Sequence, residues 1–169
     1  MDIQTLFFAV VAAVAILSGI LVITCRNPIN SALSLVMTFF CLATLYVMLD
    51  APFMAAIQVI VYAGAIMVLI IFVIMLLNVR VESGKKYTHG VLIGAIMAVL
   101  LLFEAFYFLS RSSLTGAKGM IDANVVQNVG HVELIGRAMY TDFLLPFEIT
   151  SILLLVAIIG AVILAKKKI

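Results

Sequence analysis

The chain has little charge, and this scarcity limits what the protein can be. Only 11% of its 169 residues are Asp, Glu, Lys or Arg, whereas 66% are hydrophobic. An ordinary soluble domain has about 25% charged residues, so the composition excludes a soluble globular fold. The net charge of +2 is spread over short connections and forms no basic surface, which excludes a nucleic-acid-binding protein.

Residues that bind metals or form disulfides are also scarce. Cys25 and Cys41 belong to no CxxC motif, and neither histidine stands at ligand spacing from them. We therefore expect no metal site and no disulfide framework. Both cysteines are interpreted as small apolar packing residues.

Long uncharged apolar runs occupy most of the chain instead. A helix needs about 17–25 apolar residues to cross a hydrocarbon layer about 30 Å thick. The sequence therefore predicts an all-α integral membrane protein with five transmembrane helices and a long external loop between helices 4 and 5. We expect one membrane domain over residues 1–169, with spans at about 3–24, 29–49, 53–78, 89–109 and 143–165.

The first two spans have recognisable ends. No Lys or Arg precedes the first apolar run, and the run is too long for a signal-peptide core, so we expect a retained membrane helix. Asn27 is suited to cap the second helix, with Pro28 at its first position, where the missing N–H costs nothing.

The distribution of Lys and Arg predicts the orientation. One face holds seven basic residues in short loops or at a span end, whereas the other holds three within one long loop. By the positive-inside rule, the carboxyl end is cytoplasmic and the amino end is external. The seven are Arg26, Arg80, Lys85, Lys86, Lys166, Lys167 and Lys168, and the three are Arg111, Lys118 and Arg137.

The long loop, residues 110–142, contains an apolar pattern between Val125 and Tyr140. Apolar residues recur there at three- and four-residue steps. Such a pattern predicts a short amphipathic helix on the outer face, covered by lipid headgroups or by a partner. An irregular loop with scattered apolar residues is the alternative.

Acidic residues inside spans are few, and this bears on proton transport. Glu104 and Glu148 are the only two, and each lies about five residues from the outer end of its span. We interpret Glu148 as an interfacial carboxylate favoured by the positive end of its helix, and Glu104 as reaching the outer water layer. The alternative places either residue on a proton path.

The third span has a weak point near its middle, at Tyr62-Ala63-Gly64-Ala65. Glycine lowers helix stability, so an extra residue can be accommodated there as a π-bulge, a distortion common at functional sites. The alternative is a notch of small residues for close helix packing, with Tyr62 hydrogen-bonded to a neighbouring backbone.

The residues around this weak point resemble a known family. The run Ile60–Leu69, followed by Phe72–Asn78, resembles the third helix of subunit J of bacterial respiratory complex I (NADH-quinone oxidoreductase), the counterpart of mitochondrial NADH dehydrogenase subunit 6. Residues 27–33, 140–148 and 153–165 resemble further family segments in the same order.

The resemblance implies a core membrane-arm subunit whose partners are the other membrane-arm subunits. It also implies a third helix that switches between a π-bulged and a regular form. That family role falls on Val61, Tyr62, Ala63, Gly64, Ala65, Met67 and Val68. Some relatives place an acid four residues before the tyrosine, where this chain has Gln58, so no proton-transfer role is carried over there.

The same resemblance implies that this chain binds no cofactor and contains no catalytic centre. NADH, FMN, iron–sulfur clusters and quinone would belong to other subunits of the complex. An equivalent subunit of a membrane-bound hydrogenase or of a multi-subunit cation/proton antiporter is the alternative. A stand-alone small transporter is a third class, which the missing mid-membrane charge disfavours.

Overall fold

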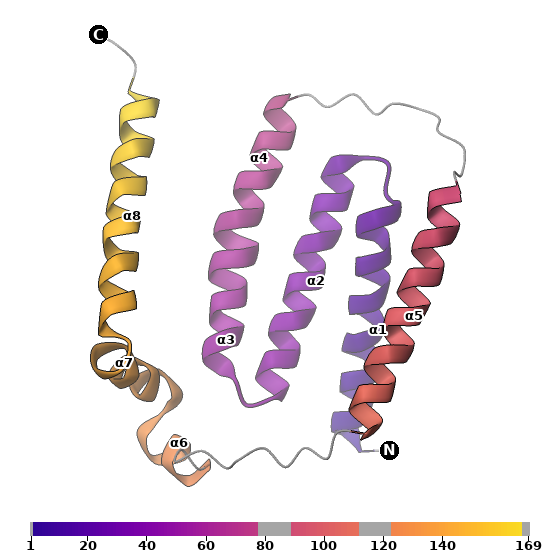
Figure 1. Cartoon of the computed structure of the whole chain (residues 1–169), viewed down its shortest axis with the longest axis horizontal. Coiled ribbons are helices and arrows are strands. Elements are labelled where there is room, and N and C mark those ends of the chain that lie inside the picture. The colour runs from indigo at the N-terminus through magenta and orange to yellow at the C-terminus, as the bar shows by residue number, and fades with distance from the viewer. Residues whose placement is uncertain (1, 78–88, 112–122, 167–169) are drawn as a thin grey trace. The chain divides into compact units, whose positions relative to one another are not determined.

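The computed structural model describes residues 2–77, 89–111 and 123–166, and within these ranges every regular element is helical (Figure 1). Five helices are long and apolar enough to cross a membrane. They confirm the predicted five-span, all-α membrane fold, and their ends lie within two residues of the expected ones wherever the structure describes them. These spans are α1 (Ile3–Thr24), α2 (Pro28–Met48), the third span (Pro52–Leu77), α5 (His89–Arg111) and α8 (Leu144–Ala165).

A short turn at Cys25–Asn27 joins α1 to α2. The side chain of Asn27 accepts a hydrogen bond of 2.9 Å from the amide of Ile29, and Pro28 is the first helical residue. This is the predicted cap, and it satisfies an amide that the start of the helix would otherwise leave unpaired.

Polar side chains connect α1 and α2 along their length. The hydroxyl of Thr38 lies 2.9 Å from that of Ser18, which is buried, and the hydroxyl of Ser31 donates to the carbonyl of Val22. In a lipid environment such interhelical hydrogen bonds contribute because apolar surfaces gain little from each other. The two helices therefore form a connected pair.

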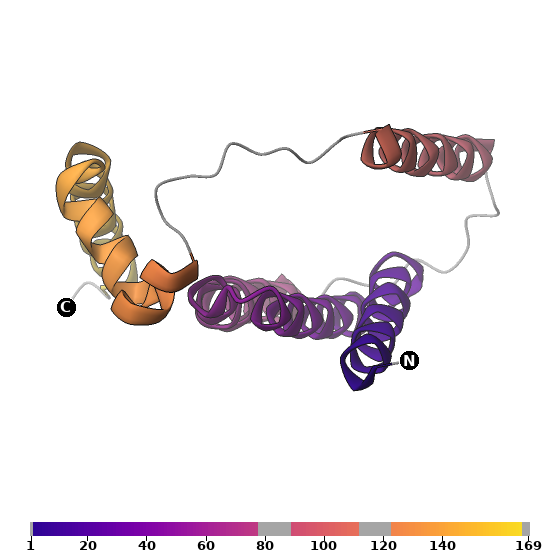
Figure 2. The same ribbon diagram turned by 90° about the horizontal axis from the view of Figure 1, so that it is seen from below.

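The third span consists of α3 (Pro52–Ile57), a π-helix η1 (Gln58–Ile66) and α4 (Met67–Leu77). It follows a turn in which Asp50 has a positive φ of 54°. Both η1 and α4 contact α2, so α2 lies between α1 and the third span (Figures 1 and 2). The expected last residue of this span, Asn78, lies outside the described residues.

The segment before the last span is helical but interrupted. Two helices, α6 (Ala123–Val129) and α7 (His131–Thr141), replace the single amphipathic helix that we expected and exclude an irregular loop over that range. Gly130 separates them with a φ of +92°, a conformation that ends a right-handed helix and that glycine adopts without a steric penalty. In α7, Arg137 pairs with Glu133 at 2.7 Å.

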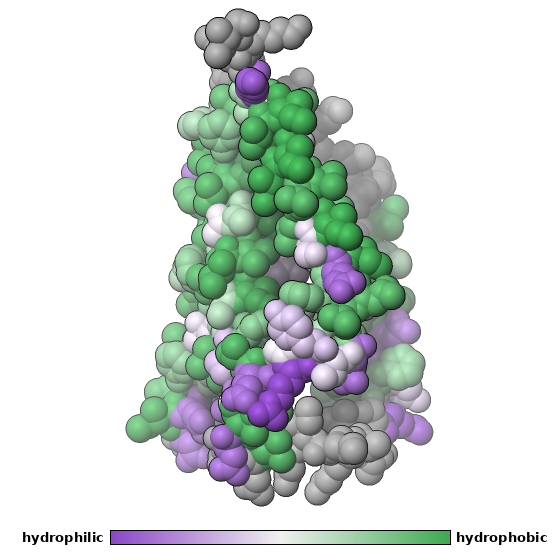
Figure 3. Space-filling view, turned by 90° about the vertical axis from the view of Figure 1, so that its left-hand side faces the viewer, coloured by the Kyte–Doolittle hydropathy of each residue, from purple (hydrophilic) through white to green (hydrophobic). Residues whose placement is uncertain are grey.

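The last span, α8, follows α7 directly. Tyr140 at the end of α7 packs its ring against Phe147 of α8, with 5.2 Å between the ring centroids. Apolar side chains cover α8 along its length, whereas hydrophilic side chains gather toward α7 (Figure 3). This pattern is that of a membrane span preceded in the chain by an interfacial segment.

Contacts between residues gather the chain into two compact units. One comprises Met1–Asp50 and Met54–Lys118, and the other comprises Ala51–Phe53 and Gly119–Ile169. The single membrane domain over residues 1–169 stays a prediction. Six of the basic residues used to predict the orientation lie outside the described residues, namely Arg80, Lys85, Lys86, Lys118, Lys167 and Lys168.

Candidate functional site

The most unusual backbone in the described chain is η1, in the middle of the third span. At its end the amide of Met67 donates to the carbonyl of Tyr62, five residues earlier, whereas an α-helix pairs residues four apart. Of the residues that the resemblance singled out, Val61, Tyr62, Ala63, Gly64 and Ala65 lie in η1, and Met67 and Val68 lie in α4. Three residues before them, Gln58, Val59 and Ile60, also belong to η1.

Gly64 gives η1 the room that this hydrogen-bond pattern needs. A Cβ atom built on Gly64 would lie 3.2 Å from the carbonyl oxygen of Val59, closer than is usual for such a contact. Val59 is the residue five positions earlier, with which position 64 pairs in a π-helix. Glycine therefore leaves room for this close approach of the backbone.

The spacing of the buried residues in the third span also shows that η1 contains one residue more than an α-helical turn. Ala55, Gln58, Ala63 and Met67 are buried, and the steps between them are three, five and four residues. A regular α-helix returns to one face after three or four residues, so the step of five crosses η1. Met67 is only 1% exposed and is the most deeply buried side chain of the span. The π-helix thus decides which residues face the rest of the unit.

Tyr62 occupies the centre of η1 and is held from one side. Its side chain is 45% exposed, and its ring lies 5.8 Å from that of Phe39 on α2, in an edge-on arrangement with an interplanar angle of 60°. Within the described part of the chain, the Tyr62 hydroxyl has no hydrogen bond to a backbone group. The ring contact was not found by sequence reasoning, which offers a backbone hydrogen bond of Tyr62 only as part of the alternative to a π-bulge.

Gln58 begins η1 and is the other polar side chain of this segment. It is 8% exposed, and among the described residues no hydrogen bond to its side chain is formed. Among the described residues no fully buried side-chain nitrogen or oxygen lacks a hydrogen bond, so the Gln58 amide keeps its polar end accessible although most of the residue is buried.

The two acidic residues inside spans lie far from η1 in sequence, and only Glu104 belongs to the same unit as η1. Glu104 belongs to α5 and Glu148 to α8, and both are exposed in their own units. Glu148 is in the second turn of its helix, and its carbonyl accepts a hydrogen bond of 2.7 Å from the hydroxyl of Ser151. Within the described ranges, no three His, Cys, Asp or Glu side chains come together in a way that could hold a metal.

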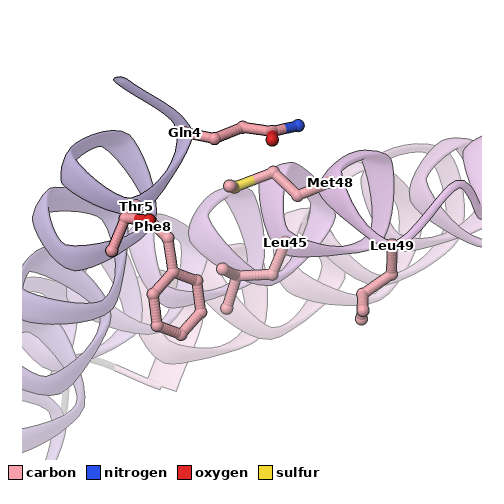
Figure 4. Close-up of a pocket in the computed structure, with 6 residues that line it drawn as sticks. All are labelled: Gln4, Thr5, Phe8, Leu45, Met48 and Leu49. Atoms are coloured by element: carbon pink, nitrogen blue, oxygen red, sulfur yellow. The ribbon is translucent and has the colours of Figure 1, made fainter. Parts of the chain in front are cut away.

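Two hollows open beside α2, and neither has the side chains for catalysis. A cleft of about 410 Å³ lies between α1 and the end of α2 (Figure 4). Its lining residues are Gln4, Thr5, Phe8, Leu45, Met48 and Leu49. A groove of about 500 Å³ lies beside α3 and the start of η1, lined by Phe7, Phe40, Ala43, Thr44, Val47, Met48, Ala55, Ala56 and Val59. Neither lining includes a titratable group, so no acid–base or nucleophilic chemistry is supported there.

Comparison with known proteins identifies the family. Residues 18–164 match the family described as NADH-ubiquinone/plastoquinone oxidoreductase chain 6. The chain is 40% identical to NAD(P)H-quinone oxidoreductase chain 6 of Leptolyngbya boryana, over 98% of this chain and 81% of that protein. It is 34% identical to the chloroplastic subunit 6 of Physcomitrium patens, over 98% and 85%.

A further relative carries the other form of the family name. The chain is 34% identical to NADH-ubiquinone oxidoreductase chain 6 of Prototheca wickerhamii, over 95% of this chain and 86% of that protein. The family match covers α2, the third span with all of η1, and α5 completely, together with all of α8 but its last residue and the final third of α1. The chain therefore belongs to the chain 6 family of the NADH-quinone oxidoreductases and is a membrane subunit of a complex of the complex I type.

Proposed function

We propose that this chain couples quinone reduction to proton translocation through a change in the hydrogen-bond register of its third span. The observation that carries the proposal is η1, a π-helix of nine residues within an apolar membrane helix. Such segments are rare and are often found at functional sites. Family membership adds that the complex around the chain is a quinone reductase.

The register change would exchange the residues that face α2. Removing the extra residue from η1 turns one end of the span relative to the other by about 100°, the angle of one α-helical residue. If the α3 end is held, Tyr62 takes the place of Ala63, and Ile66 takes the place of Met67. At the first of these positions a large buried side chain replaces a small one, and neighbouring helices must respond because packed interiors adopt discrete arrangements.

This chain contributes no redox step to the proposed reaction. NADH, FMN, iron–sulfur clusters and quinone are assigned to other subunits of the complex, as are the electron transfers between them. The chain would supply a movable helix, with Glu104 and Glu148 as its candidates for an interfacial or proton-path carboxylate. The other membrane-arm subunits and the lipid bilayer would surround it.

We also propose a location and an orientation. The chain would lie in a bacterial cytoplasmic membrane, with its amino end outside and its carboxyl end in the cytoplasm, because basic residues are concentrated on the carboxyl-terminal face. A topology reporter fused after Ile169 tests this orientation, since activity on the external side alone contradicts it.

The variant Gly64→Val tests the proposed coupling. The valine Cβ would meet the Val59 carbonyl at 3.2 Å, and its branch would add further crowding in the π register. We expect the complex to assemble and to keep its rate with an artificial electron acceptor. Quinone-linked turnover and proton pumping should fall together, as measured in the same membranes.

Gly19→Val is the matched control, because a Cβ at Gly19 in α1 meets nothing within 4 Å. It should leave quinone-linked turnover and protons pumped per electron unchanged. If Gly64→Val lowers the amount of complex while the remainder pumps normally per electron, Gly64 serves packing alone and the proposed coupling fails.

A further inference from the structure

We propose that Phe39 of α2 is the positioning residue that holds η1 in its π register, through its ring contact with Tyr62. The inference deepens the proposed function and rests on it for the consequence in proton pumping. The contact joins two different helices, with 5.8 Å between the ring centroids. An edge-on aromatic pair at this distance contributes beyond the apolar area that it buries.

Phe39 belongs to α2, which is hydrogen-bonded to α1. Its neighbour Thr38 donates to Ser34 on its own helix, at 3.0 Å, or to Ser18 on α1, at 2.9 Å. Ser31 adds a second connection, to the carbonyl of Val22. The Thr38–Ser18 bond fixes α2 against α1 close to the level at which Phe39 meets η1, and the Ser31 bond fixes the pair about two turns away. The position of the Phe39 ring is therefore fixed by the hydrogen-bonded pair of α1 and α2.

Tyr62 belongs to η1, the segment whose hydrogen-bond register would change. Its side chain is 45% exposed, and among the described residues Phe39 is its one aromatic neighbour. A change of η1 to α-helical pairing with the α3 end held would turn Tyr62 toward the position of Ala63, which is buried. A tyrosine ring needs much more room than an alanine methyl. The π register keeps Tyr62 in contact with the Phe39 ring, and the Phe39 ring thus favours that register.

The test is a classification of the third span in images of the whole resting complex, by electron cryomicroscopy. Phe39→Leu removes the ring and keeps an apolar side chain. We expect the ratio of π to α register to fall about two- to tenfold, the range that one aromatic pair supports. Phe39→Tyr keeps the ring and should restore the ratio of the unmodified complex.

The matched control is Phe8→Leu, which removes a ring from α1. Because α1 packs on α2 and makes no contact with η1, the ratio should stay unchanged. Should Phe39→Leu fail to assemble, Tyr62→Leu removes the same contact from its exposed side and is expected to give the same shift. An unchanged ratio in the variant that assembles overturns the role of Phe39, and so does an equal shift in Phe8→Leu.

Proton pumping separates this inference from the proposed function. In the same Phe39→Leu complex, quinone-linked turnover and protons per electron should change along with the register ratio. A shifted ratio with unchanged pumping supports the positioning role of Phe39 and contradicts the coupling role of η1. An unchanged ratio contradicts the positioning role, whatever the pumping.

Discussion

The α1–α2 pair and the third span are both apolar and lie next to each other, yet they are stabilised differently. In the pair, a capped turn and the hydroxyls of Ser18, Ser31 and Thr38 satisfy polar groups within and between helices. In the third span, η1 departs from α-helical pairing. We therefore call the α1–α2 pair the frame, because its hydrogen bonds hold the two helices together, whereas the backbone pairing of the third span is the part suited to change.

The difference also concerns how glycine is used. Gly19 in α1 could accept a Cβ without touching anything within 4 Å, so its backbone needs no special room. Gly64 in η1 has the Val59 carbonyl at 3.2 Å from the same built atom. A Cβ at Gly19 thus meets nothing beyond its own turn of helix, whereas a Cβ at Gly64 lies close to the carbonyl with which its residue pairs in the π register. Comparing equivalent substitutions at the two positions separates helix propensity from register.

Among the variants compared below, Gly64→Ala is expected to have the largest effect on quinone-linked turnover, because it favours in the third span the α-helical pairing that α1 and α2 already have. In the α register, alanine is better than glycine by roughly 0.5–1 kcal/mol. In the π register, its methyl group meets the Val59 carbonyl. Both effects favour the α register, so the π population should fall about fivefold or more, and quinone-linked turnover should fall with it.

Gly19→Ala is the control for this prediction, because it supplies the same gain in helix propensity without the contact. Turnover per assembled complex, measured beside the rate with an artificial acceptor, should be normal in Gly19→Ala and low in Gly64→Ala. Normal turnover in both variants would show that the register of η1 does not limit the reaction.

A smaller effect is expected from Thr38→Val, which weakens the frame. Valine has the shape of threonine but cannot donate to Ser18, and an interhelical hydrogen bond in a membrane contributes about 1 kcal/mol or less. The melting temperature of the purified complex should fall slightly. Protons pumped per electron should stay normal, because Ser31 and the apolar packing still hold α2.

Thr44→Val is the matched control for the frame. The hydroxyl of Thr44 donates only to the carbonyl of Phe40 in its own helix, at 2.9 Å. Its loss should leave the melting temperature nearly unchanged. Equal melting temperatures in the Thr38 and Thr44 variants would mean that the interhelical bond adds nothing to the frame.

How far the sequence predicts the structure also differs between the two regions. Run lengths and the Asn27–Pro28 cap predict α1 and α2 because span length and capping depend on local residues. In the third span, Gly64 marks the weak point, but the start of η1 at Gln58 has no signal. Nearly every residue there is apolar, so no periodicity distinguishes a step of five from a step of four. The Phe39–Tyr62 contact depends on how α2 and η1 pack, and sequence spacing alone does not give it.

The smallest effect is expected from Glu148→Gln in α8, a span with regular α-helical pairing. Its carboxylate is exposed in the second turn of the helix, where the positive end of the helix stabilises a negative charge by about 1 kcal/mol or less. The variant should assemble and keep most of its quinone reductase activity. Glu104→Gln in α5 is the companion variant, since that side chain is also exposed in its own unit. A pumping defect in Glu148→Gln, with normal assembly, would instead place this carboxylate on a water-filled proton path and would extend the working part of the chain beyond the third span.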